Sequence, residues 1–163
     1  MLKRCYIGEF LSKRPSYKGC SVTDEWLRFS TFKAWMETQD WEGKQMDKDI
    51  LFPDNKTYGP ETCVFVDAKV NSFIIERTAS RGEWPIGVIL YKQGGKFGAQ
   101  CGSVVTGKQE YLGLFLTPEE AHQVWLTFKL EQAHILAAEQ TDERVAKALI
   151  DRYENFVDIE KAA

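Results

Sequence analysis

The sequence predicts an α+β protein built from short antiparallel strands and amphipathic helices. Three observations favour this class. Two strand candidates, residues 46–51 and 62–66, flank a Pro-Asp-Asn turn. Three more strand candidates between residues 86 and 115 are joined by glycine-containing turns. A strong helix start at Thr117 follows them directly.

The composition fits a globular chain of one domain or two small ones. Of its 163 residues, 44% are hydrophobic and 28% are charged. The net charge of −3 argues against a generally basic nucleic-acid-binding protein, so any DNA binding requires a local basic patch. No apolar run reaches membrane-spanning length and the start lacks a secretory signal, so we expect no membrane partner.

The four cysteines are widely scattered and form no CxxC pair. We therefore expect reduced thiols and a cytoplasmic location. A zinc site made from Cys5, Cys20 and Cys63 is the alternative, and it would need a fourth ligand.

The first region begins with a basic loop, "KRPSYKG", in the first twenty residues. Aromatic residues then recur at three- and four-residue steps between 24 and 36, which predicts one amphipathic helix or two short ones. We expect these aromatics to form core, with base stacking as the alternative. The strands at 46–51 and 62–66 should form a hairpin, and Asp67 should cap a helix that buries Val70, Phe73 and Ile74. Residues 75–83 have the composition of a linker.

The second region contains strand candidates at residues 86–91, 97–101 and 111–115. Thr117, Pro118 and Glu120 then form a predicted capping box for a long helix. The expected buried positions of this helix are Ala121, Val124, Trp125, Phe128 and Ile135. A last helix should start near Thr141-Asp142 and bury Val145, Leu149, Ile150 and Tyr153. One face of the three-stranded sheet packs on the long helix, and the other stays open for a ligand.

Two segments resemble known families. The segment "CSVTDEWLRFSTFKAWM…DWEGKQMDKDILFPDNKTYGPETCVFV" resembles phage homing-endonuclease-like proteins of the His-Asn-His (HNH) class, in which a ββα-metal hairpin and helix bind a divalent cation. The segment "GVILYKQGGKFGAQC…YLGLFLTPEEAHQVW" resembles the APETALA-type DNA-binding domain of plant ethylene-response factors. The resemblances imply three regions: an HNH-like region (1–76), an APETALA-type domain (84–140) and a C-terminal helix (141–163).

The first resemblance implies a phage endonuclease that uses Mg²⁺ to cleave phosphodiesters. It assigns Asp47, Lys48, Asp49 and Asn55 to the catalytic positions, and Asp47, Asp49 and Asn71 to the metal. Strand alternation would place Asp47 and Asp49 on one face, with Lys48 opposite. The histidine base of the family is missing, and Lys48 lies near its position. The alternative is an ordinary hairpin whose charges face water.

The chain has two histidines, His122 and His134, and both lie on the long helix of the second region. Neither is therefore expected to replace the missing base.

The second resemblance implies binding of double-stranded DNA by alternate side chains on the open sheet face. The predicted contacts are Arg81, Tyr91, Lys92, Lys96, Gln100 and Lys108. The alternative is a half-solvated sheet with ordinary surface lysines.

Three functions therefore remain open at this point. The chain is either an active HNH-like endonuclease or a catalytically inactive descendant that binds DNA or a host protein. The inactive form would act in the host bacterial cytoplasm, in phage takeover of the host or as an anti-defence inhibitor. The third reading is a pure protein-interaction module that uses exposed apolar residues such as Ile89 and Trp84.

Overall fold

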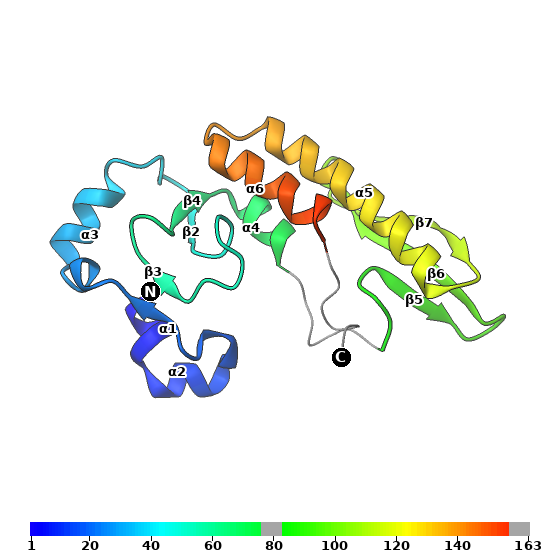
Figure 1. The fold of residues 1–163 in the computed structure, drawn as a ribbon, viewed down its shortest axis with the longest axis horizontal. Coiled ribbons are helices and arrows are strands. Elements are labelled where there is room, and N and C mark those ends of the chain that lie inside the picture. Colours follow the sequence, from blue (N-terminus) through cyan, green and yellow to red (C-terminus); the bar gives the residue numbers. More distant parts are fainter. Residues whose placement is uncertain (76–82, 157–163) are drawn as a thin grey trace. The chain divides into compact units, whose positions relative to one another are not determined.

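A computed structural model describes residues 1–75 and 83–156 and confirms the α+β class (Figure 1). The chain divides into two compact units, Met1–Ile74 and Ile75–Ala163, and each is described by itself. None of the helices in the described ranges has the length and apolarity that crossing a bilayer requires.

The first unit consists of short elements. Its helices are α1 (Leu2–Tyr6), α2 (Gly8–Lys13), the 3₁₀ helices η1 (Pro15–Tyr17) and η2 (Asp24–Leu27), α3 (Phe29–Met36) and α4 (Ala68–Ile74). Its strands are β1 (Ser21–Val22), β2 (Gln45–Asp47), β3 (Thr57–Tyr58) and β4 (Val64–Val66). The predicted basic loop, residues 13–19, contains the 3₁₀ helix η1, and the helices α1 and α2 that precede it were not predicted.

The predicted hairpin of the first unit forms from β2 and β4. These strands pair antiparallel, with Met46 opposite Phe65 and Asp47 opposite Val64. Helix α4 follows β4 and buries Val70, Phe73 and Ile74, as the sequence predicted. A second, parallel pairing joins β1 to β3 and was not predicted.

Cysteines and aromatic rings form the core of the first unit. Its buried cluster consists of Cys5, Cys20, Val22, Trp26, Tyr58 and Cys63. Phe32 and Trp35 pack against this cluster, so most of the helical aromatics are core as predicted. Phe29 is the exception, with 73% of its surface exposed.

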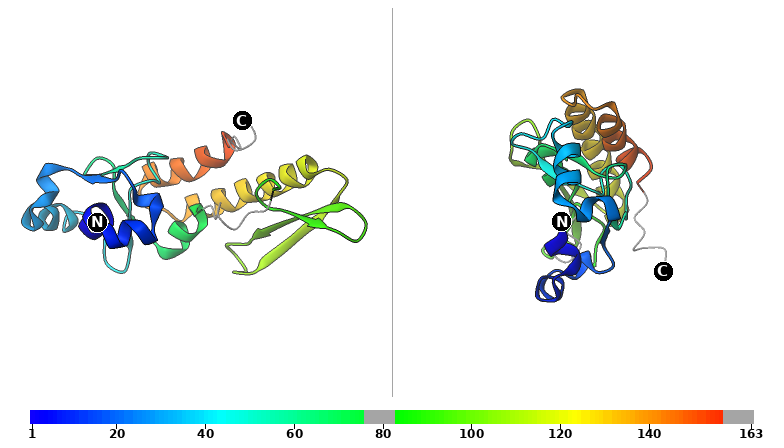
Figure 2. Two further views of the ribbon diagram at one scale, coloured as in Figure 1. Left: turned by 90° about the horizontal axis from the view of Figure 1, so that it is seen from below. Right: turned by 90° about the vertical axis from the view of Figure 1, so that its left-hand side faces the viewer.

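The second unit is a three-stranded antiparallel sheet packed on one long helix, with a final helix packed on that helix. Strands β5 (Val88–Tyr91), β6 (Lys96–Gly102) and β7 (Gln109–Phe115) lie in the order β5-β6-β7. Helix α5 (Pro118–Ala138) runs along one face of the sheet, and α6 (Glu143–Glu154) packs on α5 (Figure 2). The final helix is thus part of the second unit's packing.

Helix α5 begins with the predicted capping box. The Thr117 hydroxyl accepts a hydrogen bond from the backbone N–H of Glu120, and the Glu120 carboxylate accepts one from the N–H of Thr117. Trp125 and Leu136 lie on the buried side of this helix. Ile135 was predicted to be buried but is 38% exposed. His122 is buried too, and its Nδ1 lies 2.9 Å from the Ile86 carbonyl oxygen.

Candidate functional site

The first candidate site is the loop that follows β2. Its turn is formed by Asp47, whose Oδ1 accepts hydrogen bonds from the backbone N–H groups of Asp49 and Ile50, both at 2.7 Å. This side-chain cap bends the chain away from the strand direction. The prediction that Asp47 and Asp49 share a strand face is therefore wrong, because β2 ends at Asp47.

Lys48 is a buried lysine, with only 5% of its surface exposed. Its ammonium donates to the Asn55 carbonyl oxygen at 2.6 Å and forms an ion pair with the Asp49 carboxylate. It also lies 5.8 Å from the centre of the Tyr58 ring. Lys48 therefore lies beside Asp49 as its partner, although alternation predicted it on the opposite face.

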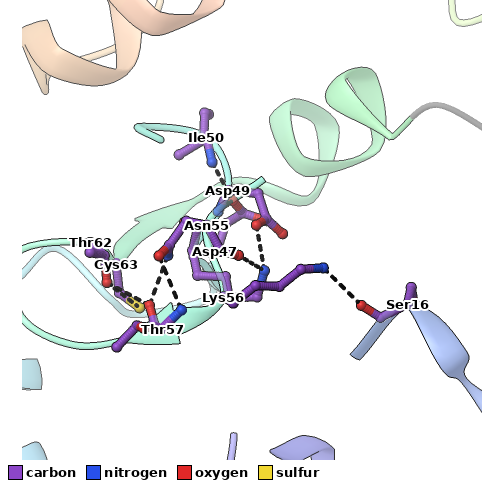
Figure 3. Close-up of polar contacts among 10 residues, drawn as sticks. Ser16, Asp47, Asp49, Ile50, Asn55, Lys56, Thr57, Thr62 and Cys63 are labelled. Carbon is purple, nitrogen blue, oxygen red and sulfur yellow. Dashed lines mark hydrogen bonds and ion pairs between the residues drawn. The ribbon is translucent and has the colours of Figure 1, made fainter. Parts of the chain in front are cut away.

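Asn55 completes this loop by using every polar atom of its side chain. Its Nδ2 donates to the Lys48 carbonyl oxygen at 2.8 Å. The same Nδ2 donates to the Thr57 carbonyl oxygen at 2.7 Å, and its Oδ1 accepts from the Thr57 N–H at 3.0 Å (Figure 3). Lys48 and Asn55 thus bond to each other's backbone. These reciprocal bonds close the loop and position β3, which starts at Thr57.

The chemistry of this loop depends on its buried carboxylate. Burial raises the pKa of Asp47, and the hydrogen bonds from the Asp49 and Ile50 N–H groups only partly oppose it. A raised pKa means that the surroundings disfavour the negative charge that a metal ligand carries. The neighbouring Lys48 ammonium would also repel a second cation.

Asn71, the third predicted metal ligand, lies on α4. Its Nδ2 donates to the Gln45 Oε1 on β2 at 2.5 Å. Within residues 1–75 and 83–156, no group of three or more His, Cys, Asp or Glu side chains is arranged to hold a metal ion. The predicted residues fit Mg²⁺ poorly as they stand, because Asp47, Asp49 and Asn71 each already use one side-chain atom in a bond to another part of the protein. Magnesium binding stays a prediction.

The cysteines of the zinc alternative do come together. Cys5, Cys20 and Cys63 all belong to the core cluster of the first unit, and all are free thiols. Burial raises the pKa of the Cys5 and Cys63 thiols, so the protonated form is favoured over the thiolate that zinc requires. Their packing in an apolar core accounts for their gathering.

The second candidate site is the outer face of the sheet, opposite α5. We define it by the strand register, in which Ile89 lies opposite Gly98 and Tyr91 lies opposite Lys96 on neighbouring strands. Side chains on paired residues project from the same face. Ala99 and Cys101, which alternate with this set on β6, are buried toward the helix.

Tyr91 lies across the centre of the outer face. A Cβ atom added to Gly98 would lie 2.4 Å from Cε2 of the Tyr91 ring, so the ring covers the glycine. Tyr91 is nevertheless 40% exposed, and its hydroxyl accepts a hydrogen bond from Gln100 Nε2 at 3.4 Å. The glycine at 98 makes room for this ring.

Two further residues of the outer face were missed by sequence reasoning, Tyr111 and Leu114 on β7. They are 57% and 45% exposed. They lie opposite Gln100 and Gly98, which places both on the outer face although they are three residues apart. The reason is a bulge next to Gly113, whose φ of 134° interrupts the alternation.

The predicted lysines surround this face. Lys92 and Lys96 flank the turn between β5 and β6, and Lys108 lies just before β7. All three are exposed. Arg81 falls outside the described residues.

The surface is hollowed along β5 and the segment that precedes it. An open groove of about 470 Å³ is lined by residues that include Ile89, Lys92 and Gln100. Trp84 also lines the groove but is only half-exposed, because its ring packs edge-on against the Phe97 ring, with the ring centres 4.8 Å apart. Ile89, by contrast, is exposed as predicted, at 46%.

Comparison of this chain with models of protein families, with curated proteins and with solved structures found no match. The fold and the two candidate sites therefore carry the functional argument.

Proposed function

We propose that this protein binds double-stranded DNA through the outer face of the β5-β6-β7 sheet. The observation that carries the proposal is the combination of Tyr91, Lys96 and Gln100 on one exposed face. Amide and hydroxyl groups can form hydrogen bonds with base edges, and aliphatic side chains such as Ile89 can contact thymine methyl groups. The resemblance to the APETALA-type domain agrees with this use of the sheet.

The lysines near this face would contact phosphates, not bases. Lys92 and Lys96 at one turn, with Lys108 at another, provide few positive charges, while acidic residues outnumber basic ones between 83 and 156. We therefore expect binding that weakens strongly when salt is added.

We further propose that the loop after β2 has a structural role and that the protein does not cleave DNA. The bonds made by Asp47, Lys48 and Asn55 support this, because all three side chains are used to hold the loop in place. The protein would then be the inactive descendant of an HNH-like phage endonuclease.

Binding to labelled duplexes of random sequence, measured by fluorescence anisotropy at low salt, tests the sheet. The double variant Tyr91→Ala/Gln100→Ala should lose at least about tenfold in affinity, since each base contact is worth about 1–3 kcal/mol and about 1.4 kcal/mol is tenfold. Lys96→Gln should weaken binding, whereas Lys147→Gln, an equal charge change on α6, should not. Unchanged affinity in the double variant, or no binding by the intact chain, would contradict the proposal.

Incubation of supercoiled plasmid with the protein in Mg²⁺ and in Mn²⁺ tests the loop. We expect no nicking. Nicking that is lost in both Asp47→Ala and Asp49→Ala would support the hypothesis of an active endonuclease and contradict a purely structural role for the loop.

A host protein is the second candidate partner, and the apolar character of the outer face favours it. Ile89, Leu114 and the neighbouring Leu116 are all more than two-fifths exposed. If the intact chain fails to bind DNA, Ile89→Lys and Leu114→Lys should each abolish capture of a host protein that the wild type retains. Lys147→Gln again provides the surface control.

A further inference from the structure

Positive charge is concentrated at the start of this otherwise acidic chain. Residues 1–20 contain Lys3, Arg4, Lys13, Arg14 and Lys18, and their only acidic residue is Glu9. All five cationic side chains belong to exposed residues of α1, α2, η1 or the connections between them. This concentration opposes the net charge of −3 of the whole chain.

Aromatic rings hold two of these cations. The Lys3 ammonium lies 6.0 Å from the centre of the Phe10 ring, and the Arg4 guanidinium lies 5.4 Å from the centre of the Tyr17 ring. The two rings contact each other, with their centres 5.7 Å apart. Both cations are therefore gathered around one aromatic pair, without being neutralised.

A distant lysine joins the same region. Lys56, in the connection before β3, extends its ammonium toward the carbonyl oxygen of Ser16 in η1, at 3.4 Å (Figure 3). Ser16 precedes Tyr17, whose ring contacts Arg4, and it lies between Arg14 and Lys18 in the chain. Five cations thus border one region, which we call the N-terminal basic surface: Lys3, Arg4, Arg14, Lys18 and Lys56.

These cations make no ion pair with a carboxylate in the described part of the chain, whereas Lys13 pairs with Glu9 at 2.8 Å. Exposed, unneutralised cations at several points on a folded surface are suited to phosphates, because each contact releases a condensed counterion from the nucleic acid. The sheet face of the second unit has few cations, so further phosphate contacts would have to be supplied elsewhere.

We propose that the N-terminal basic surface binds the phosphate backbone of double-stranded DNA. This inference rests on the proposed function, and it adds phosphate contacts by the first unit to the base contacts and the few phosphate contacts of the second. Leu2, Tyr6 and Ile7 are exposed nearby in sequence, so an anionic membrane is the competing partner that the experiment must exclude.

The test replaces the three cations that make no ring contact, as Arg14→Gln/Lys18→Gln/Lys56→Gln. The matched control is Arg28→Gln/Lys33→Gln/Lys69→Gln, which removes the same charge from exposed residues elsewhere in the first unit. Affinity for random-sequence duplex is measured against salt concentration. The first variant should lower the slope of log Kobs against log salt by about 2–3, since each phosphate contact contributes about 0.9. The control should keep the wild-type slope.

The outcomes separate this inference from the proposed function. An unchanged slope in the basic-surface variant, with weaker binding by the sheet variants, overturns this inference alone. A reduced slope with wild-type binding by the sheet variants supports the basic surface and overturns the sheet. No DNA binding by the intact chain overturns both. Loss of binding to phosphatidylserine vesicles in the basic-surface variant, with DNA binding unchanged, overturns the inference in favour of a membrane.

Discussion

The loop after β2 and the outer sheet face differ in which side chains they expose. The loop bonds its polar groups to one another, whereas the sheet face exposes aromatic and aliphatic side chains. In the loop, charged and amide groups are turned inward and bond to one another, as Lys48 does with Asp49 and Asn55. On the sheet, Tyr111 and Leu114 face water. The difference shows that the polar residues of this chain that look most catalytic help to hold its fold, while aromatic and aliphatic residues form its more open surface.

The largest expected effect comes from substituting two glycines of the second unit, one beside a buried ring and one beside the open outer face. Gly87 has a φ of 81°, and an added Cβ would lie 2.0 Å from Cδ1 of buried Trp125. Gly87→Ala should therefore cost about 3 kcal/mol of unfolding free energy, from overpacking and backbone strain together. Gly98→Ala displaces only the half-exposed Tyr91 ring and should cost about 1 kcal/mol or less. Urea unfolding measures both.

Gly107→Ala is the matched control for backbone strain. Gly107 also has a positive φ, 68°, but an added Cβ would meet nothing within 4 Å. Its substitution should cost about 1 kcal/mol. Equal losses at Gly87 and Gly98 would show that the outer face is packed as tightly as the inner one.

The next largest effect is expected in the loop. Lys48→Met removes the buried ammonium and leaves the Asn55 carbonyl oxygen without this donor, so the first unit should lose about 2 kcal/mol. Hydrogen exchange in peptides covering residues 45–66 reports this loss locally. Lys44→Met removes an exposed pair with Asp40 and should change exchange little, by about 0.5 kcal/mol or less. Similar exchange in the two variants would argue against a structural role for Lys48.

The smallest effect concerns the pH dependence of Asp47. Because burial raises its pKa, the folded protein keeps this proton at pH values where the unfolded chain has lost it. The resulting stabilisation is present below the ordinary pKa of 3.8 and is lost as pH rises through the raised value. Asp47→Asn keeps the Oδ1 acceptor and does not titrate. Its stability relative to wild type should therefore increase from about pH 3 to about pH 7.

Denaturant unfolding of both proteins across this pH range provides the measurement. If the unfolding free energy of the wild type instead rose relative to that of Asp47→Asn as pH rises, the folded loop would favour a charged carboxylate, as a cation site does. Thr62 lies between β3 and β4, and its hydroxyl donates to the Thr57 carbonyl oxygen at 2.8 Å. Thr62→Val removes this bond but no titrating group, so it should give a pH-independent difference from wild type.

The elements that obey short-range rules were predictable from the sequence. Thr117, Pro118 and Glu120 specify the start of α5 within four residues, and the structure has the expected capping box. The parallel pairing of β1 with β3 was not predictable in this way. Each of these strands has two residues, and their partners lie far apart in the sequence, as with Val22 and Tyr58.

The candidate sites show the same limit. Strand alternation predicted Tyr91, Lys96 and Gln100 as exposed or partly exposed, which is how the structure has them. Alternation failed at Asp49, because the Asp47 side chain competes with strand pairing for the backbone N–H groups. It also fails across the bulge at Gly113, which brings Leu114 to the face occupied by Tyr111. A side-chain hydrogen bond to the backbone and a single inserted residue can each change which face of a strand the following side chains occupy.

The burial of the cysteines has a practical consequence. Cys5, Cys20 and Cys63 are enclosed in the first unit, and Cys101 is enclosed in the second. An alkylating reagent can therefore reach each sulfur only when the unit around it opens. Peptide mass mapping after timed alkylation would record the opening rates of both units in the same native sample, without any introduced label.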